Sequence, residues 1–468
     1  MNNIICNHFF STSRLRVLAG RFAVGFLLTS QCLAAPAFPL TDSAPDSEAF
    51  RARFLASYGV NAEVEPRFTP EDRVLYERIL PFLTEDPQRA MVEVEKALGS
   101  EENAAFRFLL GNLNYDLGNF ARAEAELKRA IEAFPDFRRA HRTLGLLQIR
   151  SERYPEAIAT WLKVITLGGG DAQSYGLLGY AYLSEKKHQS ALSAYRMARM
   201  FKPDSIDFRR GEALALMATH EFSQAAALFD ELIAEQPTVA DHWLQQGNLY
   251  LQNERYEDAI ANFEVVHDLG AGNVATRFVL GDLHLRTENE RLALLHYQAA
   301  VNHPQFGNED VSRALQALRH LVDRGLLNEA RSYLEALRPA LPEQLDQRDH
   351  DSLVFAEARL AVDSGHASEA FTLLKQLVER NPLHADGLIL LAELYQESDD
   401  FARAEFYLER ALSIPERKAD ALVALGRLEV SRGNWKAALV HLRNAEQLRA
   451  HAGLRRYIES IEAAARRQ

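Results

Sequence analysis

Two short stretches of the sequence contain residue types that could do chemistry. His220 opens "HEFSQ", which begins like a helical zinc-protease motif, but Gln224 stands where that motif needs a second histidine. The stretch "GGGD", residues 168–171, could suggest a phosphate-binding loop, yet no Gly-Lys-Ser/Thr follows it. We therefore interpret His220 as a turn residue and the glycines as the stop signal of a helix.

Other residues with metal-binding or catalytic chemistry are scattered along the chain. Both cysteines, Cys6 and Cys32, lie close to the start of the sequence, so the remainder cannot form a thiolate metal site. No arrangement of nucleophile, base and orienting group is recognisable. We therefore predict that the protein is not an enzyme and has no cofactor or metal. The histidines considered as ligands, which show no ligand spacing, are His267, His284, His296 and His303.

Length and composition describe a folded chain that does not bind polyanions. The 468 residues are too many for one ordinary core, so several domains or a repeat array are expected. Hydrophobic residues make up 47% and charged residues 25%, which is typical of a folded protein. The formal net charge of −12 argues against general binding to nucleic acid.

Residues 1–37 have the pattern of a signal peptide. A stretch with three arginines and no acid is followed by the apolar run "FAVGFLLTSQCLAA" and then by small residues. Cleavage is expected after Ala34 or Ala37. We therefore expect an exported protein with no transmembrane domain in the mature chain.

Two alternatives to a cleaved signal peptide are open. One is an uncleaved membrane anchor, although the apolar run of about 14 residues is shorter than the roughly 20 that a spanning helix needs. The other is lipid attachment at Cys32, although Gln31, directly before it, is not a small residue.

A repeat of 34 residues runs through the middle of the chain. Small residues recur at this spacing, with Ala213 in the place of one missing glycine, at Gly111, Gly145, Gly179, Gly247 and Gly281. A second small residue follows each after twelve positions, at Ala123, Ala157, Ala191, Ala225, Ala259 and Ala293. A large residue follows four positions later, at Leu127, Trp161, Tyr195, Phe229, Phe263 and Tyr297.

This pattern resembles the tetratricopeptide repeat, in which each unit is a pair of helices. The resemblance implies an all-α fold, a right-handed α-solenoid of antiparallel helix pairs. Small residues at the helix crossing let the backbones approach closely, and stacking of neighbouring units covers the apolar faces.

The repeat pattern divides the sequence into seven segments. We predict a signal peptide at 1–37, a linker with a short helix at 38–69, a degenerate N-terminal repeat at 70–103, six regular units at 104–307, an irregular unit with a bend at 308–350, further repeat units at 351–452 and a capping helix at 453–468.

In this family the first helix of each pair lines a concave groove that binds peptides or partner helices. The corresponding positions here are Phe108, Asn112, Tyr115, Arg139, Arg142, Leu146, Ile149, Arg150, Tyr180, Leu183, Arg210, Leu214 and Met217. Arginines and aromatic residues are common interface anchors, so these positions predict a groove for a segment with apolar anchors and some acidic residues.

An alternative packing and an incomplete motif limit this interpretation of the groove. The same residues could pack inside a tightly wound superhelix, with the arginines balancing nearby acids. The dicarboxylate clamp of chaperone-binding members is not matched either: Asn112 suits it, but Phe108 and Leu146 stand where a basic residue and a second asparagine are wanted.

Two segments, "FPDFRRAHRTLGL" and "GGGDAQSYGLLGYAYL", resemble parts of exported bacterial repeat proteins encoded beside TonB, ExbB and ExbD components. The resemblance implies a periplasmic protein of Gram-negative bacterial origin. Its expected role is that of a non-catalytic scaffold in a TonB-type energy-transduction system, with a protein or peptide partner in the cell envelope. The alternative is a structural adaptor for exopolysaccharide assembly or export. No barrel-like alternating strands follow the repeats, which weakens that alternative.

Overall fold

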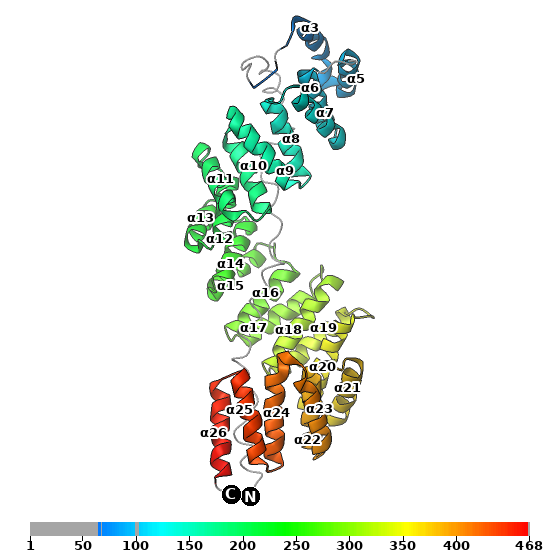
Figure 1. Ribbon diagram of the computed structural model, residues 1–468, viewed down its shortest axis with the longest axis vertical. Coiled ribbons are helices and arrows are strands. Elements are labelled where there is room, and N and C mark those ends of the chain that lie inside the picture. Colours follow the sequence, from blue (N-terminus) through cyan, green and yellow to red (C-terminus); the bar gives the residue numbers. More distant parts are fainter. Residues whose placement is uncertain (1–63, 67, 99–102, 467–468) are drawn as a thin grey trace. The chain divides into compact units, whose positions relative to one another are not determined.

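The computed structural model describes residues 64–66, 68–98 and 103–466 (Figure 1). The predicted signal peptide at 1–37 lies outside the described residues, as does most of the predicted linker at 38–69. Val64–Pro66 and the residues just before α3 are not helical. No helix in the described part of the chain is long and apolar enough to cross a membrane.

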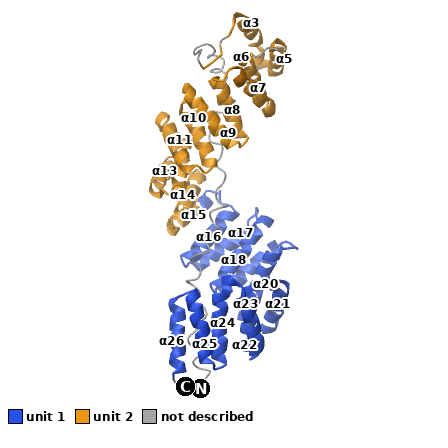
Figure 2. Cartoon of the chain, in the orientation of Figure 1, with its two compact units in different colours: residues 1–32, 266–468 blue, residues 33–265 orange. Residues whose placement is uncertain are grey.

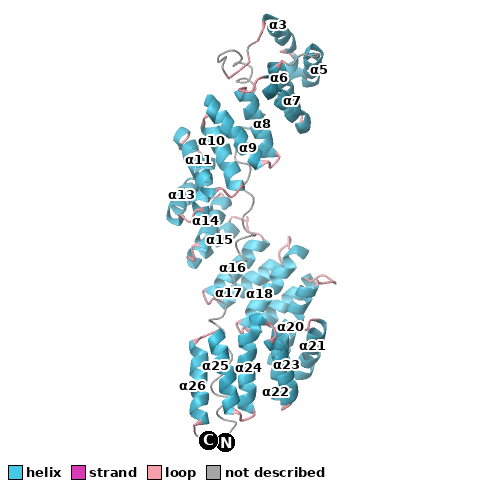
Figure 3. Ribbon diagram, in the orientation of Figure 1, coloured by secondary structure: helices cyan, strands magenta, loops and turns pink. Residues whose placement is uncertain are grey.

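Every regular element in the described residues is a helix (Figure 3). Consecutive helices pack as pairs, which confirms the predicted all-α solenoid. The first helices are α3 (Pro70–Ile79), α4 (Phe82–Glu85), α5 (Pro87–Leu98), α6 (Ala104–Asp116), α7 (Phe120–Ala133), α8 (Arg138–Arg150), α9 (Tyr154–Val164), α10 (Ala172–Ser184), α11 (His188–Phe201), α12 (Ile206–Ala218), α13 (Phe222–Glu235), α14 (Ala240–Gln252) and α15 (Tyr256–Asp268). They are followed by α16 (Val274–Arg286), α17 (Glu290–Val301), α18 (Val311–Asp323), α19 (Leu327–Leu337), α20 (Gln347–Asp363), α21 (Ala367–Arg380), α22 (Ala385–Glu397), α23 (Phe401–Leu412), α24 (Lys418–Ser431), α25 (Trp435–Leu448) and α26 (Ala452–Ala465).

The chain forms two compact units (Figure 2). The N-terminal unit contains the described residues up to Val265, and the C-terminal unit contains those from Val266 onward. The division falls within α15. The sequence places its change of repeat spacing later, at 308–350.

Small residues at the helix crossings hold each pair together. The repeated alanines Ala123 and Ala157 are fully buried, with 0% of their surface exposed, and so are their four equivalents at Ala191, Ala225, Ala259 and Ala293. A Cβ built on Gly145 would come within 2.9 Å of the indole of Trp161 in the same pair. Tyr195 packs against the backbone of the next pair as well, because a Cβ on Gly211 would lie 2.3 Å from its ring. The large residues therefore fill the space both within and between units.

The turn inside each regular pair has one residue with left-handed backbone. Only one of the six regular units uses glycine there, although this conformation favours glycine. At Glu152 the turn is closed by hydrogen bonds from its N–H to Ile149 O (3.0 Å) and from Arg153 N–H to Gln148 O (2.9 Å). These bonds satisfy carbonyl groups at the end of α8. The six positions, again 34 residues apart, are Gly118, Glu152, Lys186, His220, Glu254 and Glu288, with φ between 55° and 76°.

The stretch at 308–350 contains two 3₁₀ turns, Asn308–Asp310 and Arg338–Ala340. The second leads toward α20, which has 17 residues where α18 has 13. These extra residues make the irregular unit predicted here longer than a regular one. They lie within the C-terminal unit.

Candidate protein-interaction surface

The two motifs that could suggest chemistry both lie at helix ends. His220 has φ 62° and occupies the turn between α12 and α13, so it is not part of a zinc-binding helix. Gly168, with φ 76°, ends the helical backbone after α9. Asp171 caps α10, because its carboxylate accepts a hydrogen bond from Ser174 N–H at 2.7 Å. The glycine-rich stretch therefore connects two repeat units.

The predicted groove residues divide by exposure into two groups. Those buried in the core are Phe108, Tyr115, Leu146, Ile149, Tyr180 and Met217. Those that are partly or fully exposed are Asn112, Arg139, Arg142, Arg150, Leu183, Arg210 and Leu214. The candidate interaction surface consists of this second group, which lies on α6, α8, α10 and α12 of the N-terminal unit.

Two arginines of this surface bridge to the following repeat. Arg142 Nη1 donates to Asp171 Oδ2 at 2.8 Å, and Arg210 Nη1 donates to Asp241 Oδ2 at 3.4 Å. Burial alone would raise the pKa of Asp171, but Arg142 and the Ser174 N–H outweigh this and hold it below its ordinary value. Each arginine thus meets an acid supplied by the next helix pair.

Arg139 binds a carboxylate from outside the regular repeats. Its Nε donates to Glu65 Oε2 at 2.7 Å. The guanidinium also lies near two aromatic rings, 5.6 Å from the centroid of Phe108 and 6.0 Å from that of Phe137. Arg150 lies in a similar way over the ring of Phe120, at 4.5 Å.

Asn112 is held by contacts within the chain. Its Nδ2 donates to Phe108 O at 2.8 Å, and its Oδ1 accepts from Thr143 Oγ1 at 3.2 Å. Both ends of the amide are therefore engaged, and α6 and α8 are linked through it.

Ion pairs such as these are easily exchanged for contacts with a ligand. The side chains of Arg142 and Asp171 are 27% and 48% exposed, so water screens their attraction. Exposed pairs of this kind contribute only about 0–1 kcal/mol to stability. A partner carboxylate could replace Asp171 or Asp241 at little cost, and the arginines would stay in place.

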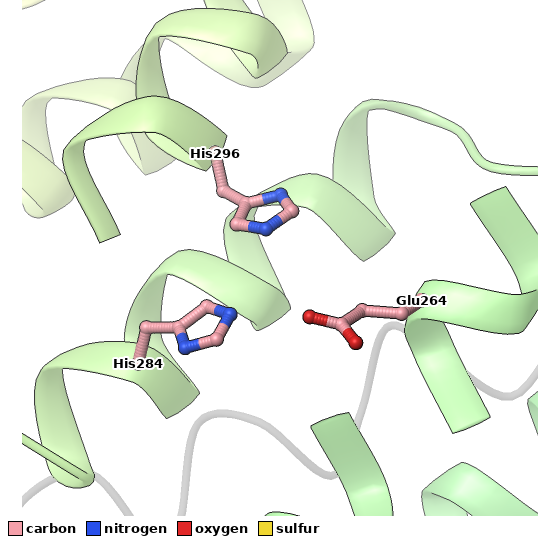
Figure 4. Close-up of side chains that lie close together, drawn as sticks. All are labelled: Glu264, His284 and His296. Carbon is pink, nitrogen blue, oxygen red and sulfur yellow. The ribbon is translucent and has the colours of Figure 1, made fainter. Parts of the chain in front are cut away.

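The packing of neighbouring helices brings together histidines that have no ligand spacing in the sequence. In the C-terminal unit the rings of His284 on α16 and His296 on α17 stack with centroids 5.2 Å apart (Figure 4). The ring centroid of His267 lies 6.5 Å from that of His296. Burial, followed by nearby positive charges, lowers the pKa of both His267 and His296 to about 4. These imidazoles are therefore neutral at neutral pH. Glu264, which Figure 4 also draws, belongs to the N-terminal unit.

A polar depression in the C-terminal unit is a second candidate surface. Residues of α18 and α20 and the turn before α22 line it. Most of its charges are paired within the chain: Arg319 donates to Asp386 at 2.8 Å, and Asp351 accepts from Arg380 and from Asn381. The arginines of the N-terminal surface are paired in the same way, but that surface also occupies the groove positions predicted from the repeat.

The acids that form ion pairs with Arg142 and Arg210 were not predicted from the sequence. Asp171 and Asp241 lie 29 and 31 residues after their arginines, which is close to one repeat length. The repeat spacing could therefore have been used to find these acids. The register also relates His284 and His296, because each lies three positions after a small residue of the crossing. Glu65 had no such signal.

Comparisons with known proteins identify the family. Models described as tetratricopeptide repeat match residues 87–136, 108–172, 143–206, 210–274, 244–310 and 361–415, which together span more than half of the chain. The chain belongs to the tetratricopeptide repeat family. No curated protein matches it. The family matches indicate no catalytic family, and the fold is that of a protein-interaction scaffold.

Several solved structures are similar to parts of this chain. A tetratricopeptide repeat protein from Parabacteroides merdae is 16% identical over 52% of this chain and 97% of its own, with a TM-score of 0.38. YrrB, described as a TPR protein with an unusual peptide-binding site, is 20% identical over 42% of this chain and 97% of its own, with a TM-score of 0.37. MamA from Desulfovibrio magneticus RS-1 is 17% identical over 36% of this chain and 98% of its own, with a TM-score of 0.33.

Proposed function

We propose that this protein is a non-catalytic scaffold in the periplasm, where it holds envelope proteins together as an accessory component of a TonB-type energy-transduction system. The observation that carries the scaffold role is the row of partly exposed arginines on α8 and α12, each held by a carboxylate that a partner could replace. The periplasmic location is supported by the pattern of residues 1–37. The TonB-type assignment is supported by the two segments that resemble proteins encoded beside TonB, ExbB and ExbD.

The surface favours a partner segment with both acidic and apolar residues. Arg142 and Arg210 offer charge, and the partly exposed Leu183 and Leu214 offer apolar contact between them along α10 and α12. Arginine is among the residues enriched at the centres of interfaces, so Arg142 and Arg210 are the expected anchors.

Affinity capture from cross-linked envelope tests this proposal. A tagged full-length chain is compared with its Arg142→Gln/Arg210→Gln variant, which removes two charges from the surface. The matched control is Lys186→Gln/Lys187→Gln, which removes two charges from an exposed turn of the same unit. We expect the native chain and the lysine control to recover TonB-, ExbB- or ExbD-like proteins, and the arginine variant to recover about tenfold less.

Two results would contradict this proposal. Equal recovery by the arginine variant would show that the surface does not bind the partner. Repeated recovery of glycan-export proteins, with no TonB-, ExbB- or ExbD-like protein, would favour the adaptor for exopolysaccharide assembly or export. Because each exposed ion pair contributes about 0–1 kcal/mol, circular dichroism should show that the arginine variant is still folded.

A further inference from the structure

A segment from outside the regular repeats lies on the candidate interaction surface. Val64 O accepts a hydrogen bond from Arg138 N–H at 3.1 Å, at the first turn of α8. The next residue, Glu65, accepts from Arg139 Nε at 2.7 Å. The N–H groups of a first helical turn have no partner within their own helix, so they are available to a passing chain. The segment therefore contacts α8 through both backbone and side chain.

The site that receives Glu65 is well defined. Only 5% of the surface of Glu65 is exposed, which is unusual for a carboxylate. Arg139 lies beside the rings of Phe108 and Phe137, which limit the positions open to its guanidinium. The chain turns at Val64 and bends at Glu65, directly before Pro66. The contact is therefore that of a bent segment with one buried glutamate.

The contact of Glu65 with Arg139 is also sensitive to pH. Burial raises the pKa of Glu65, and the Arg139 guanidinium opposes this rise without cancelling it. A raised pKa means that the bound state disfavours the ionised carboxylate, so binding of the segment weakens as pH rises above the ordinary range of a glutamate. At neutral pH the segment is thus held more weakly than its hydrogen bonds alone would indicate.

We propose that Arg139, positioned beside Phe108 and Phe137, is a recognition site for a glutamate in a partner segment, and that the chain's own Val64–Pro66 occupies this site until the partner displaces it. The proposal rests on the proposed scaffold function and adds the chemistry of the partner: a segment with a glutamate that reaches Arg139. An attached segment competes at an effective concentration in the millimolar range. Apparent affinity for the partner falls by the fraction of chains in which the site is open.

Peptide binding to the full-length chain tests this. The probe is a fluorescein-labelled peptide with the sequence of residues 61–69, NAEVEPRFT, read by fluorescence anisotropy. Glu65→Lys places a positive charge against Arg139 and should release the chain's own segment. We expect this variant to bind the peptide about tenfold or more tightly than the native chain. Glu71→Lys, the same charge change at an exposed residue of α3, should bind like the native chain.

Further variants separate recognition from disturbance of the fold. Glu65→Ala, which adds no charge, should also bind the peptide more tightly than the native chain, and it decides the question if Glu65→Lys fails to fold. Adding Arg139→Ala to either variant should abolish binding, as should a peptide with lysine in place of the Glu65 equivalent. Equal affinity of the native and Glu65 variants, or binding that survives the loss of Arg139, would overturn the proposal. Because only purified chain and peptide are used, such a result leaves the envelope capture experiment unaffected.

Discussion

Tyr297 packs directly against the backbone of Gly281: a Cβ built on this glycine would come within 2.3 Å of Cε1 of the ring. Gly247 holds the same place one repeat earlier, but there the nearest ring atom, Cζ of Phe263, would be 3.3 Å away. The tyrosine also cannot move aside easily, since it is fully buried and its hydroxyl donates to Asp282 at 2.6 Å. Two equivalent glycines are therefore under different steric constraint.

Alanine at these two glycines should have different effects. Gly281→Ala should destabilise the protein by about 1–3 kcal/mol, because the methyl group overpacks a fixed ring. Gly247→Ala should be close to neutral, because alanine's better helix propensity, about 1 kcal/mol, offsets a milder contact. Urea unfolding followed by circular dichroism measures both. Equal midpoints for the two variants would contradict the steric explanation.

The turn positions predict an opposite pair of effects. Lys186 has φ 57°, a left-handed conformation that costs a non-glycine residue about 1–2 kcal/mol. Lys186→Gly should therefore stabilise the protein by about 0.5–1 kcal/mol, after allowance for glycine's greater freedom in the unfolded chain. Gly118→Ala should destabilise it by a similar amount through backbone strain alone, since nothing lies within 4 Å of the new methyl group. Thermal melting of both variants checks this, and shifts of the same sign would refute it.

The repeat positions were predictable because one physical constraint recurs every 34 residues. Gly145 and Trp161 are the example: a pair of helices that cross closely needs a missing side chain on one and a large one on the other. Sequence spacing records such a constraint directly. The same spacing also indicates that His284 lies near His296, because each histidine is three residues after a crossing residue of its helix pair.

Other features of the surface could not be predicted from the repeat. The contact of Glu65 with Arg139 joins residues 74 positions apart, and one of them lies outside the regular repeats. The repeat spacing does not indicate which repeat helix such a segment contacts. Exposure was equally hard to predict, because Phe108 and Arg139 both occupy groove positions, yet the first is buried and the second is partly exposed.

Two partly buried histidines, His267 and His296, predict a loss of stability in mild acid. The folded-state pKa of both His267 and His296 is about 4, whereas an ordinary histidine titrates near 6.5. Protons therefore bind the unfolded chain more strongly between these values, so stability is complete above pH 6.5 and falls as pH drops toward 4. His267→Gln/His296→Gln should flatten this dependence of melting temperature on pH. His366→Gln, an exposed control in the same unit, should leave the slope unchanged, and an unchanged slope in the double variant would exclude this cause.

Asp282 should be among the most sensitive residues to substitution in the C-terminal unit. Its buried carboxylate accepts from Tyr297 Oη at 2.6 Å and from Arg313, and it lies 3.3 Å from His320 Nδ1. Burial would raise the pKa of Asp282, but these partners outweigh burial and lower it, so the carboxylate is ionised at neutral pH.

Asp282→Ala should cost about 3–5 kcal/mol, because it leaves Arg313 and the tyrosine hydroxyl without their acceptor. Asp282→Asn should cost less, since an amide oxygen can still accept one bond. If the unpaired charge is the main cause, adding Arg313→Met to Asp282→Ala should restore much of the loss, and urea unfolding of all four chains in this cycle measures the coupling. Additive losses in the double variant would show that the carboxylate acts through packing rather than through its pairing with Arg313.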